Sequence, residues 1–155
     1  MNLRVTLLLL ALSISSANVS AQVTSADEIV RALGTRRFDA SIVLTVHFEH
    51  DSDELTPQAQ AQLNELGEAL KSPRLRSRRF ELAGHTDSTG DAAYNLELSL
   101  RRAAAAKRYL VERLGIPEGQ IETTGYGEER PLNPDDPEAP ENRRVEVRDV
   151  GRYEE

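Results

Sequence analysis

The stretch RRFELAGHTDSTG, at residues 78–90, joins a strand pattern to a polar loop that has a glycine on each side. Phe80 and Leu82 alternate with charged residues, which predicts a strand with one buried face. A helix pattern follows at residues 91–114, and Gly115 stands where a helix commonly ends. We expect one face of this helix to pack inward, carrying Leu96, Ser99, Leu100, Ala103, Ala106, Leu110 and Leu114.

The rest of the chain supplies more elements of both kinds. The patterns predict a short helix at 25–34, a buried strand at 41–48, a helix from Thr56–Pro57 to Pro73, and strands at 120–127 and 143–150. The helix that begins at Pro57 carries an apolar stripe of Ala59, Leu63, Leu66 and Leu70. A loop rich in proline and acidic residues precedes the last strand. The order β-α-β-α-β-loop-β predicts an α+β sandwich, with helices packed on one mixed four-stranded sheet.

Length, charge and the N-terminal residues bound the function. A chain of 155 residues suits one compact domain, which we place at 41–150 with a tail at 151–155. Residues 1–21 combine a cation, a short apolar run and small residues, as in a cleaved secretory signal, so we expect a periplasmic protein. The formal net charge is −7, and the arginine-rich run at 74–79 leads into a strand, so no nucleic-acid partner is expected. The chain has no cysteine, and we expect no cofactor and no direct membrane anchor.

The loop at 84–90 admits three readings by itself. A metal site would use His47, His50, His85 and Asp87, but the first two lie three apart on a strand and so point to opposite faces. A hydrolase would combine Ser88, His85 and Asp87, although residues this close in sequence seldom align as a triad. In the third reading the loop is simply a turn, with Ser88 or Thr89 capping the next helix.

The helix behind the loop adds a cation. Asn95, Ser99 and Arg102 are spaced by four and three residues, which sets Arg102 at the edge of the apolar face. Arg101 faces the other way, where Glu97 can pair with it. Asp87 and Arg102 can therefore flank a common pocket. They either pair with each other or hold a zwitterion, with the ammonium at the carboxylate and the carboxylate at the guanidinium.

At this point several segments, in the right order, carry a family resemblance. They are HFEHDSDEL (47–55), GHTDSTG (84–90), YNLELSLRRA (94–103), GYGEERPL (125–132) and ENRRVEV (141–147). On these motifs the region 41–149 resembles the OmpA-like C-terminal domain family. The resemblance implies a β/α sandwich that binds the peptidoglycan stem peptide non-covalently at its diaminopimelate residue.

The family's binding residues map onto six positions here. The resemblance implies that Asp87 holds the ammonium and Arg102 the carboxylate at the far end of diaminopimelate. It also implies binding roles for Asn95, Thr86, Asp51 and Arg143. The chain departs from the family pattern in its acidic segment at 51–54, and in His50, which stands where an apolar or small residue is common.

Three functions follow as expectations. The first is a non-enzymatic protein that binds the stem peptide in the cell envelope, at the wall and near the outer membrane, without a metal. The second is an envelope scaffold that binds a protein partner through residues 22–40 or the acidic loop. The third is a metal-dependent cell-wall hydrolase. For residues 22–40 the alternative to a partner site is a helix that packs on the edge of the domain.

Overall fold

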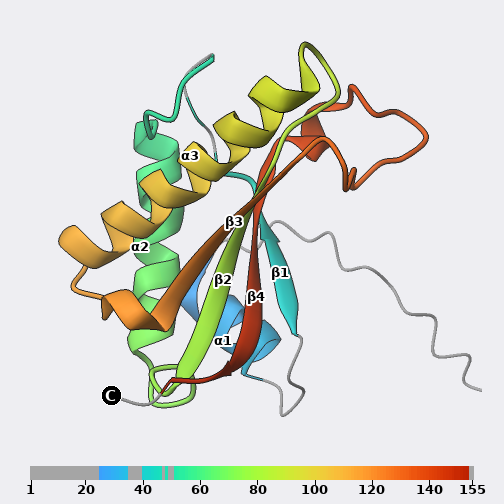
Figure 1. Cartoon of the computed structure of the whole chain (residues 1–155). Coiled ribbons are helices and arrows are strands. Elements are labelled where there is room, and N and C mark those ends of the chain that lie inside the picture. The colour runs from blue at the N-terminus through green and yellow to red at the C-terminus, as the bar shows by residue number, and fades with distance from the viewer. Residues whose placement is uncertain (1–24, 35–39, 47, 49–50, 154–155) are drawn as a thin grey trace, which may run out of the picture.

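A computed structural model describes residues 25–34, 40–46, 48 and 51–153 (Figure 1). In chain order its elements are α1 (Ala26–Leu33), β1 (Ser41–Leu44), α2 (Pro57–Lys71), β2 (Arg78–His85), α3 (Ala92–Glu112), β3 (Ile121–Gly127) and β4 (Arg144–Arg152). Short 3-10 turns, η1 (Glu118–Gln120) and η2 (Pro140–Asn142), precede the last two strands. This order confirms the predicted α+β class. The signal sequence predicted at 1–21 lies outside the described residues.

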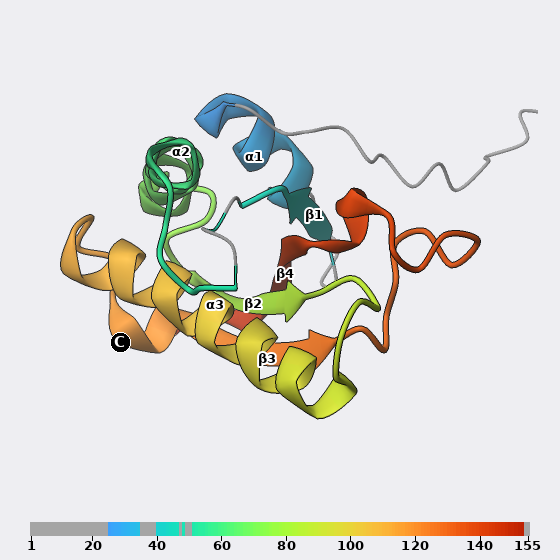
Figure 2. The ribbon, with the colours of Figure 1, turned by 90° about the horizontal axis from the view of Figure 1, so that it is seen from above.

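The four strands form one mixed sheet in the order β1-β4-β2-β3. β2 and β3 are parallel and are joined through α3, as the helix between two strands predicted, while β4 runs antiparallel to both β1 and β2. Figure 2 shows α2 and α3 over the same face of the sheet, with α1 beside α2 near the β1 edge. No helix in the described ranges is both long enough and apolar enough to cross a membrane.

The first strand is shorter than the predicted 41–48. β1 ends at Leu44, opposite Val145, and Phe48 makes only an isolated bridge to Leu55. β4 begins at Arg144, one residue after η2, so in this register Val46 has no residue of β4 to pair with. The last strand is longer than predicted. β4 runs to Arg152, so Gly151 and Arg152 of the predicted tail belong to the sheet, and the Tyr153 N–H donates to the Ser77 carbonyl oxygen at 2.9 Å.

The core lies between the sheet and α2, as the predicted stripe on that helix requires. Ala59, Leu63, Leu66 and Leu70 are all buried, and they form one cluster with Phe80 and Leu82 of β2. Thr56 caps α2 by accepting a hydrogen bond from the Ala59 N–H, directly before the helix-starting Pro57. Burial of each large apolar side chain contributes about 1.5–3 kcal/mol, so this stripe holds α2 on the sheet.

The inward face of α3 contains Ser99, Ala103, Ala106 and Leu110, as predicted, but Leu96 and Leu100 do not belong to it. Leu96 and Leu100 are 45% and 46% exposed, whereas Asn95, Leu98 and Ala105 are buried. The cause is the glycines of the sheet below the helix. A Cβ on Gly84 would stand 2.1 Å from the Ser99 carbonyl oxygen, and one on Gly125 would stand 2.6 Å from the Leu100 backbone nitrogen. The helix backbone itself therefore packs against the sheet, and Leu96 and Leu100 point outward beside the contact.

The helix within the predicted N-terminal segment is part of the domain. Ser25 and Glu28 form a capping box at the start of α1, and Ile29 and Leu33 are completely buried. The Glu65 carboxylate of α2 accepts from the Ala26 N–H at 2.8 Å, and the Arg78 guanidinium donates to the Leu33 carbonyl oxygen. Both ends of α1 are thus hydrogen-bonded to the rest of the fold, which supports the alternative that this helix packs on the domain.

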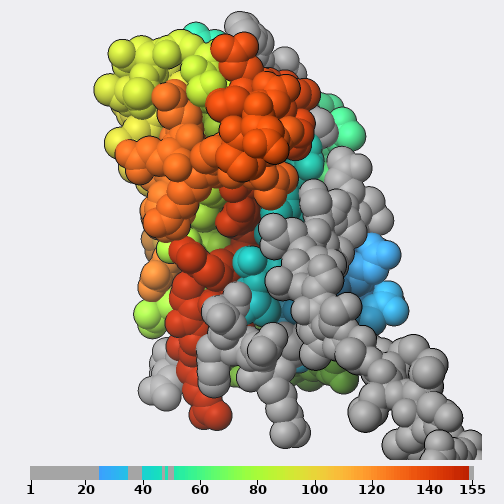
Figure 3. All heavy atoms as spheres, turned by 90° about the vertical axis from the view of Figure 1, so that its right-hand side faces the viewer, coloured from blue at the N-terminus to red at the C-terminus, as the bar shows by residue number. Residues whose placement is uncertain are grey.

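The face of the sheet turned away from α2 and α3 is polar. Arg148 of β4 pairs with Glu81 of β2, and Arg79 of β2 pairs with Glu122 of β3 at 3.2 Å. Figure 3 shows part of this side of the molecule, with the 128–143 loop above and β4 running down below it. These partly exposed cross-strand pairs explain why β2 alternates charged and apolar residues.

Candidate functional site

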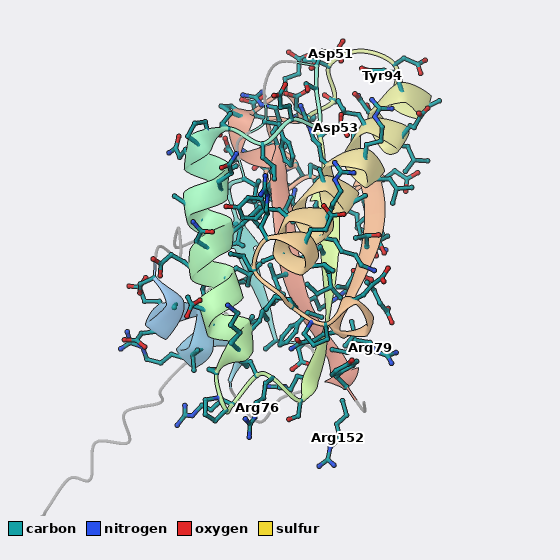
Figure 4. The ribbon with its side chains drawn as sticks, turned by 90° about the vertical axis from the view of Figure 1, so that its left-hand side faces the viewer. Asp51, Asp53, Arg76, Arg79, Tyr94 and Arg152 are labelled. Carbon is teal, nitrogen blue, oxygen red and sulfur yellow. The ribbon has the colours of Figure 1, made fainter. Side chains whose placement is uncertain are left out.

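A cavity of about 710 Å³ lies where β2 ends, α3 begins and β4 starts. Figure 4 labels Asp51 and Tyr94 at this end of the domain. All six predicted binding residues line the cavity: Asp51, Thr86, Asp87, Asn95, Arg102 and Arg143. The lining also includes eight residues that the sequence analysis did not single out as ligand-binding: Val46, Phe48, His85, Thr89, Gly90, Tyr94, Leu98 and Arg144.

The loop after β2 is held in place by backbone hydrogen bonds from the chain around it. The Thr86 N–H donates to the Gly127 carbonyl oxygen at 2.9 Å, and the Ser88 N–H donates to the Pro137 carbonyl oxygen at 3.0 Å. The predicted cap by Ser88 or Thr89 is wrong, because Asp91 caps α3 by accepting from the Tyr94 N–H at 2.9 Å. The residues before Asp91 are therefore left to shape the cavity wall.

Asp87 is an ionised carboxylate inside this loop. Its Oδ1 accepts from the Thr89 N–H at 3.0 Å and from the Thr89 hydroxyl, and its Oδ2 accepts from the Arg143 guanidinium at 2.6 Å. Burial raises the pKa of Asp87, but the hydrogen bonds from Thr89 and Arg143 outweigh burial, so the pKa lies below its ordinary value. The side chain of Asp87 is 8% exposed and that of Arg143 is 50% exposed, so the cation is the partner with freedom to move.

Arg102 does not form an ion pair with Asp87, so the alternative in which these two residues pair with each other is not observed. Its Nε donates to the Ser52 carbonyl oxygen at 3.0 Å, and its guanidinium lies 5.0 Å from the centre of the Phe48 ring. No carboxylate of the described residues lies within ion-pair distance of this group. Burial, and next the charge of Arg143, lower the pKa of Arg102, although an arginine remains protonated at neutral pH. Arg101, in contrast, pairs with Glu97 at 2.8 Å, as predicted.

Asn95 and Asp51 shape the site in different ways. The Asn95 amide nitrogen donates to the Thr89 carbonyl oxygen at 3.0 Å and to the Glu128 carboxylate at 2.8 Å, so Asn95 braces the loop. Asp51 has a left-handed backbone with φ of 50°, and it accepts a hydrogen bond from the Tyr94 hydroxyl. This bond raises the pKa of Tyr94. Sequence reasoning missed Tyr94 as a cavity residue. Its position next to the predicted binding residue Asn95, in the first turn of α3, is the sequence feature that could have identified it.

His85 forms part of the inner wall of the cavity as a neutral side chain. It is 2% exposed and stacks on the Tyr126 ring with centroids 5.4 Å apart. Burial, with the adjacent Arg144 charge, lowers the pKa of His85 to about 4. Asp87 is bound by Thr89 and Arg143 and does not orient His85, so the sequence-based triad is not formed.

The metal reading also gains no support from this geometry. Among the residues that the structure describes, no group of three histidine or acidic side chains could hold a metal ion. His47 and His50 lie outside the described residues. The cavity instead holds two carboxylates, those of Asp51 and Asp87, and three guanidinium groups, those of Arg102, Arg143 and Arg144.

Comparison with known proteins gives the family. The model of the OmpA family matches residues 47–145, which is more than half of the chain. The chain belongs to the OmpA family. It is 41% identical over 108 residues to the peptidoglycan-associated lipoprotein of Pseudomonas putida, covering 68% of this chain and 63% of the relative. Identity to the Pseudomonas aeruginosa protein of the same name is 40% over 108 residues, covering 68% of this chain and 62% of that one.

A solved structure agrees with these matches. The crystal structure of the peptidoglycan-associated lipoprotein from Burkholderia pseudomallei is 36% identical, with a TM-score of 0.56, and the match covers 67% of this chain and 87% of that one. The match thus confirms the resemblance inferred from the motifs. The chain covers less than two thirds of the length of each of the two Pseudomonas relatives. All three of these relatives are named for their association with peptidoglycan.

Proposed function

We propose that this chain binds peptidoglycan non-covalently in the bacterial cell envelope, and that its ligand is the diaminopimelate residue of the stem peptide. The names of the relatives support the first part. One observation carries the second part: a single cavity holds ionised Asp87 together with Arg102, which has no carboxylate partner among the described residues. A ligand with one ammonium and one carboxylate matches that arrangement.

The geometry suggests how the two charges are received. Arg102 is positioned in advance by the Ser52 carbonyl oxygen and the Phe48 ring, which leaves its terminal N–H groups for a carboxylate. Asp87 is positioned by Thr89 and shares its outer oxygen with the half-exposed Arg143. An incoming ammonium takes the place of Arg143 or shares Asp87 with it. The buried Asn95 amide donates to the Thr89 carbonyl oxygen and so holds the loop that carries Asp87.

Sedimentation with purified sacculi tests the proposal. Asp87→Ala and Arg102→Ala each leave one ligand charge unpaired, which costs on the order of 2–4 kcal/mol, or at least about 30-fold in Kd. Arg108→Ala is the matched control, because Arg108 is an exposed cation on the same helix and does not line the cavity. Thermal melts check that each variant is folded. If both site variants pellet with sacculi as well as the control does, the proposed site is wrong.

Competition with small molecules tests the ligand. Free diaminopimelate should release the chain from sacculi, whereas 1,5-diaminopentane, which keeps the two ammonium groups but has no carboxylate, should do so far more weakly. Equal competition by the two would refute the role of Arg102. We place the protein in the periplasm, following secretion through residues 1–21, and this location is tested by fractionating cells that express the whole chain.

A further inference from the structure

A cluster of cations lies at the end of the domain opposite the cavity. In Figure 4, Arg76, Arg79 and Arg152 lie at one end, and Asp51, Asp53 and Tyr94 lie at the other. β2 connects the two ends, and at about 3.3 Å per residue its length separates them by ~23 Å. We call this end the basic pole and define it by five residues: Lys71, Arg74, Arg76, Arg79 and Arg152.

The sheet brings the basic pole together from distant parts of the sequence. β2 and β4 are antiparallel, and their register places Arg78 opposite Arg152. The Tyr153 N–H donates to the Ser77 carbonyl oxygen at 2.9 Å, which extends this pairing toward Arg76. The arginine-rich run at 74–79, which the site does not use, thereby meets the end of β4.

Three of these cations are exposed and have no acidic partner in the described part of the chain. Lys71 pairs with Glu68, and Arg79 pairs with Glu122, each at 3.2 Å. For Arg74, Arg76 and Arg152 the described residues offer neither an ion pair nor a hydrogen bond, and all three side chains are exposed. Exposed cations that lack an acidic partner among the described residues stand out in a chain whose formal net charge is −7.

A second cavity opens beside these cations. It has a volume of about 480 Å³, and Lys71 and Arg76 contribute to its wall. Its other lining residues are mainly apolar or amphipathic: Leu70, Ser77, Ile116, Pro117, Gln120 and Tyr153. Cations next to an apolar recess and a tyrosine match the boundary between lipid headgroups and acyl chains.

We propose that the basic pole docks the domain on an anionic phospholipid bilayer, with Arg74, Arg76 and Arg152 contacting headgroup phosphates. The cations spread across one end of the domain, which suits a flat surface that carries many phosphates. The opposite end carries the acidic segment 51–54, which the same surface repels. The domain would therefore stand with its cavity turned away from the membrane and toward the wall.

Vesicle co-sedimentation tests this docking. The chain from Gln22 to Glu155 is mixed with vesicles of phosphatidylcholine alone, or with vesicles that also contain phosphatidylglycerol. Glu154 and Glu155 are kept, so their charges are included. Binding is expected only with the anionic vesicles, and it should vanish in 1 M NaCl because the Debye length there is about 3 Å. Each arginine removed near an anionic surface weakens binding by about fivefold, so Arg76→Gln/Arg152→Gln should bind on the order of 25-fold more weakly.

The control variant is Arg101→Gln/Arg130→Gln, which removes the same charge on the cavity side of the molecule. It should bind anionic vesicles within about twofold of the unchanged chain. Equal loss in the two variants, or equal binding to neutral vesicles, would overturn the proposal. So would binding to an immobilised polyglutamate peptide in the absence of any binding to vesicles, because an acidic protein would then be the better partner. Sacculus binding by the basic-pole variant should be unchanged, which separates this test from that of the wall site.

Discussion

The close approach of α3 to β2 makes Gly84→Ala a sharp test of the fold that supports the cavity. The added Cβ would lie 2.1 Å from the Ser99 carbonyl oxygen and 2.9 Å from the Ser99 carbonyl carbon. Both are backbone atoms of a helix and cannot rotate away, so α3 must move off the sheet by roughly 1 Å. Overpacking of this kind costs ~1–3 kcal/mol, and the rigid neighbour places Gly84→Ala near 3 kcal/mol.

The assay is thermal and urea unfolding followed by circular dichroism. A loss of about 3 kcal/mol lowers the Tm of a chain of this size by roughly 10 °C. Gly90→Ala is the control, because Gly90 has φ of 91° but no atom within 4 Å of an added Cβ. It is affected by backbone strain alone and should lose ~1–2 kcal/mol. The reasoning fails if Gly84→Ala is as stable as the wild type or more stable than Gly90→Ala. Since α3 carries Arg102, Gly84→Ala should also weaken sacculus binding.

Other perturbations separate the remaining contributions to stability. The pKa of His85 is lowered to about 4 in the fold, so between ~6.5 and 4 the unfolded chain binds a proton that the folded chain does not. The free energy of unfolding should therefore fall by on the order of 3 kcal/mol as the pH drops through this window. Urea unfolding at several pH values should show a smaller fall for His85→Phe. Arg78→Met leaves the buried carboxylate of Asp149 without its ion partner, and the cost of ~3–5 kcal/mol should be largely recovered in Arg78→Met/Asp149→Leu, as measured by urea unfolding. Equal stability of the single and double variants would refute the role of that pair. Because the pKa of Asp87 is lowered in the fold, its stabilising contribution is present above pH ~3.9 and is lost as the pH falls through the folded pKa. Arg143→Gln removes the ion pair and should raise the pKa of Asp87, as measured by carbon NMR titration of its carboxyl group. An unchanged pKa would show that the ion pair is unimportant.

Much of the fold could be predicted from local patterns in the sequence. Alternation at Phe80 and Leu82 and the stripe on α2 predicted elements that the structure contains, because side-chain periodicity follows directly from backbone geometry. Turn and cap residues at Thr56–Pro57 and Ser25 marked where α2 and α1 begin. The cavity lining was also anticipated at six positions, although Asp51, Thr86 and Arg143 rested on family motifs rather than on spacing.

The tertiary structure alone decided which groups meet. Asp87 pairs with Arg143 because β4 lies beside β2, a neighbour that no spacing within 84–102 could reveal. Leu100 is exposed because Gly125, from another strand, lets the helix backbone take the space that a side chain would fill. Arg76 and Arg152 form one basic pole through the same β2–β4 pairing. Sequence periodicity determines secondary structure because it acts over one or two turns, whereas charge partners and burial depend on contacts between segments that are far apart in the chain.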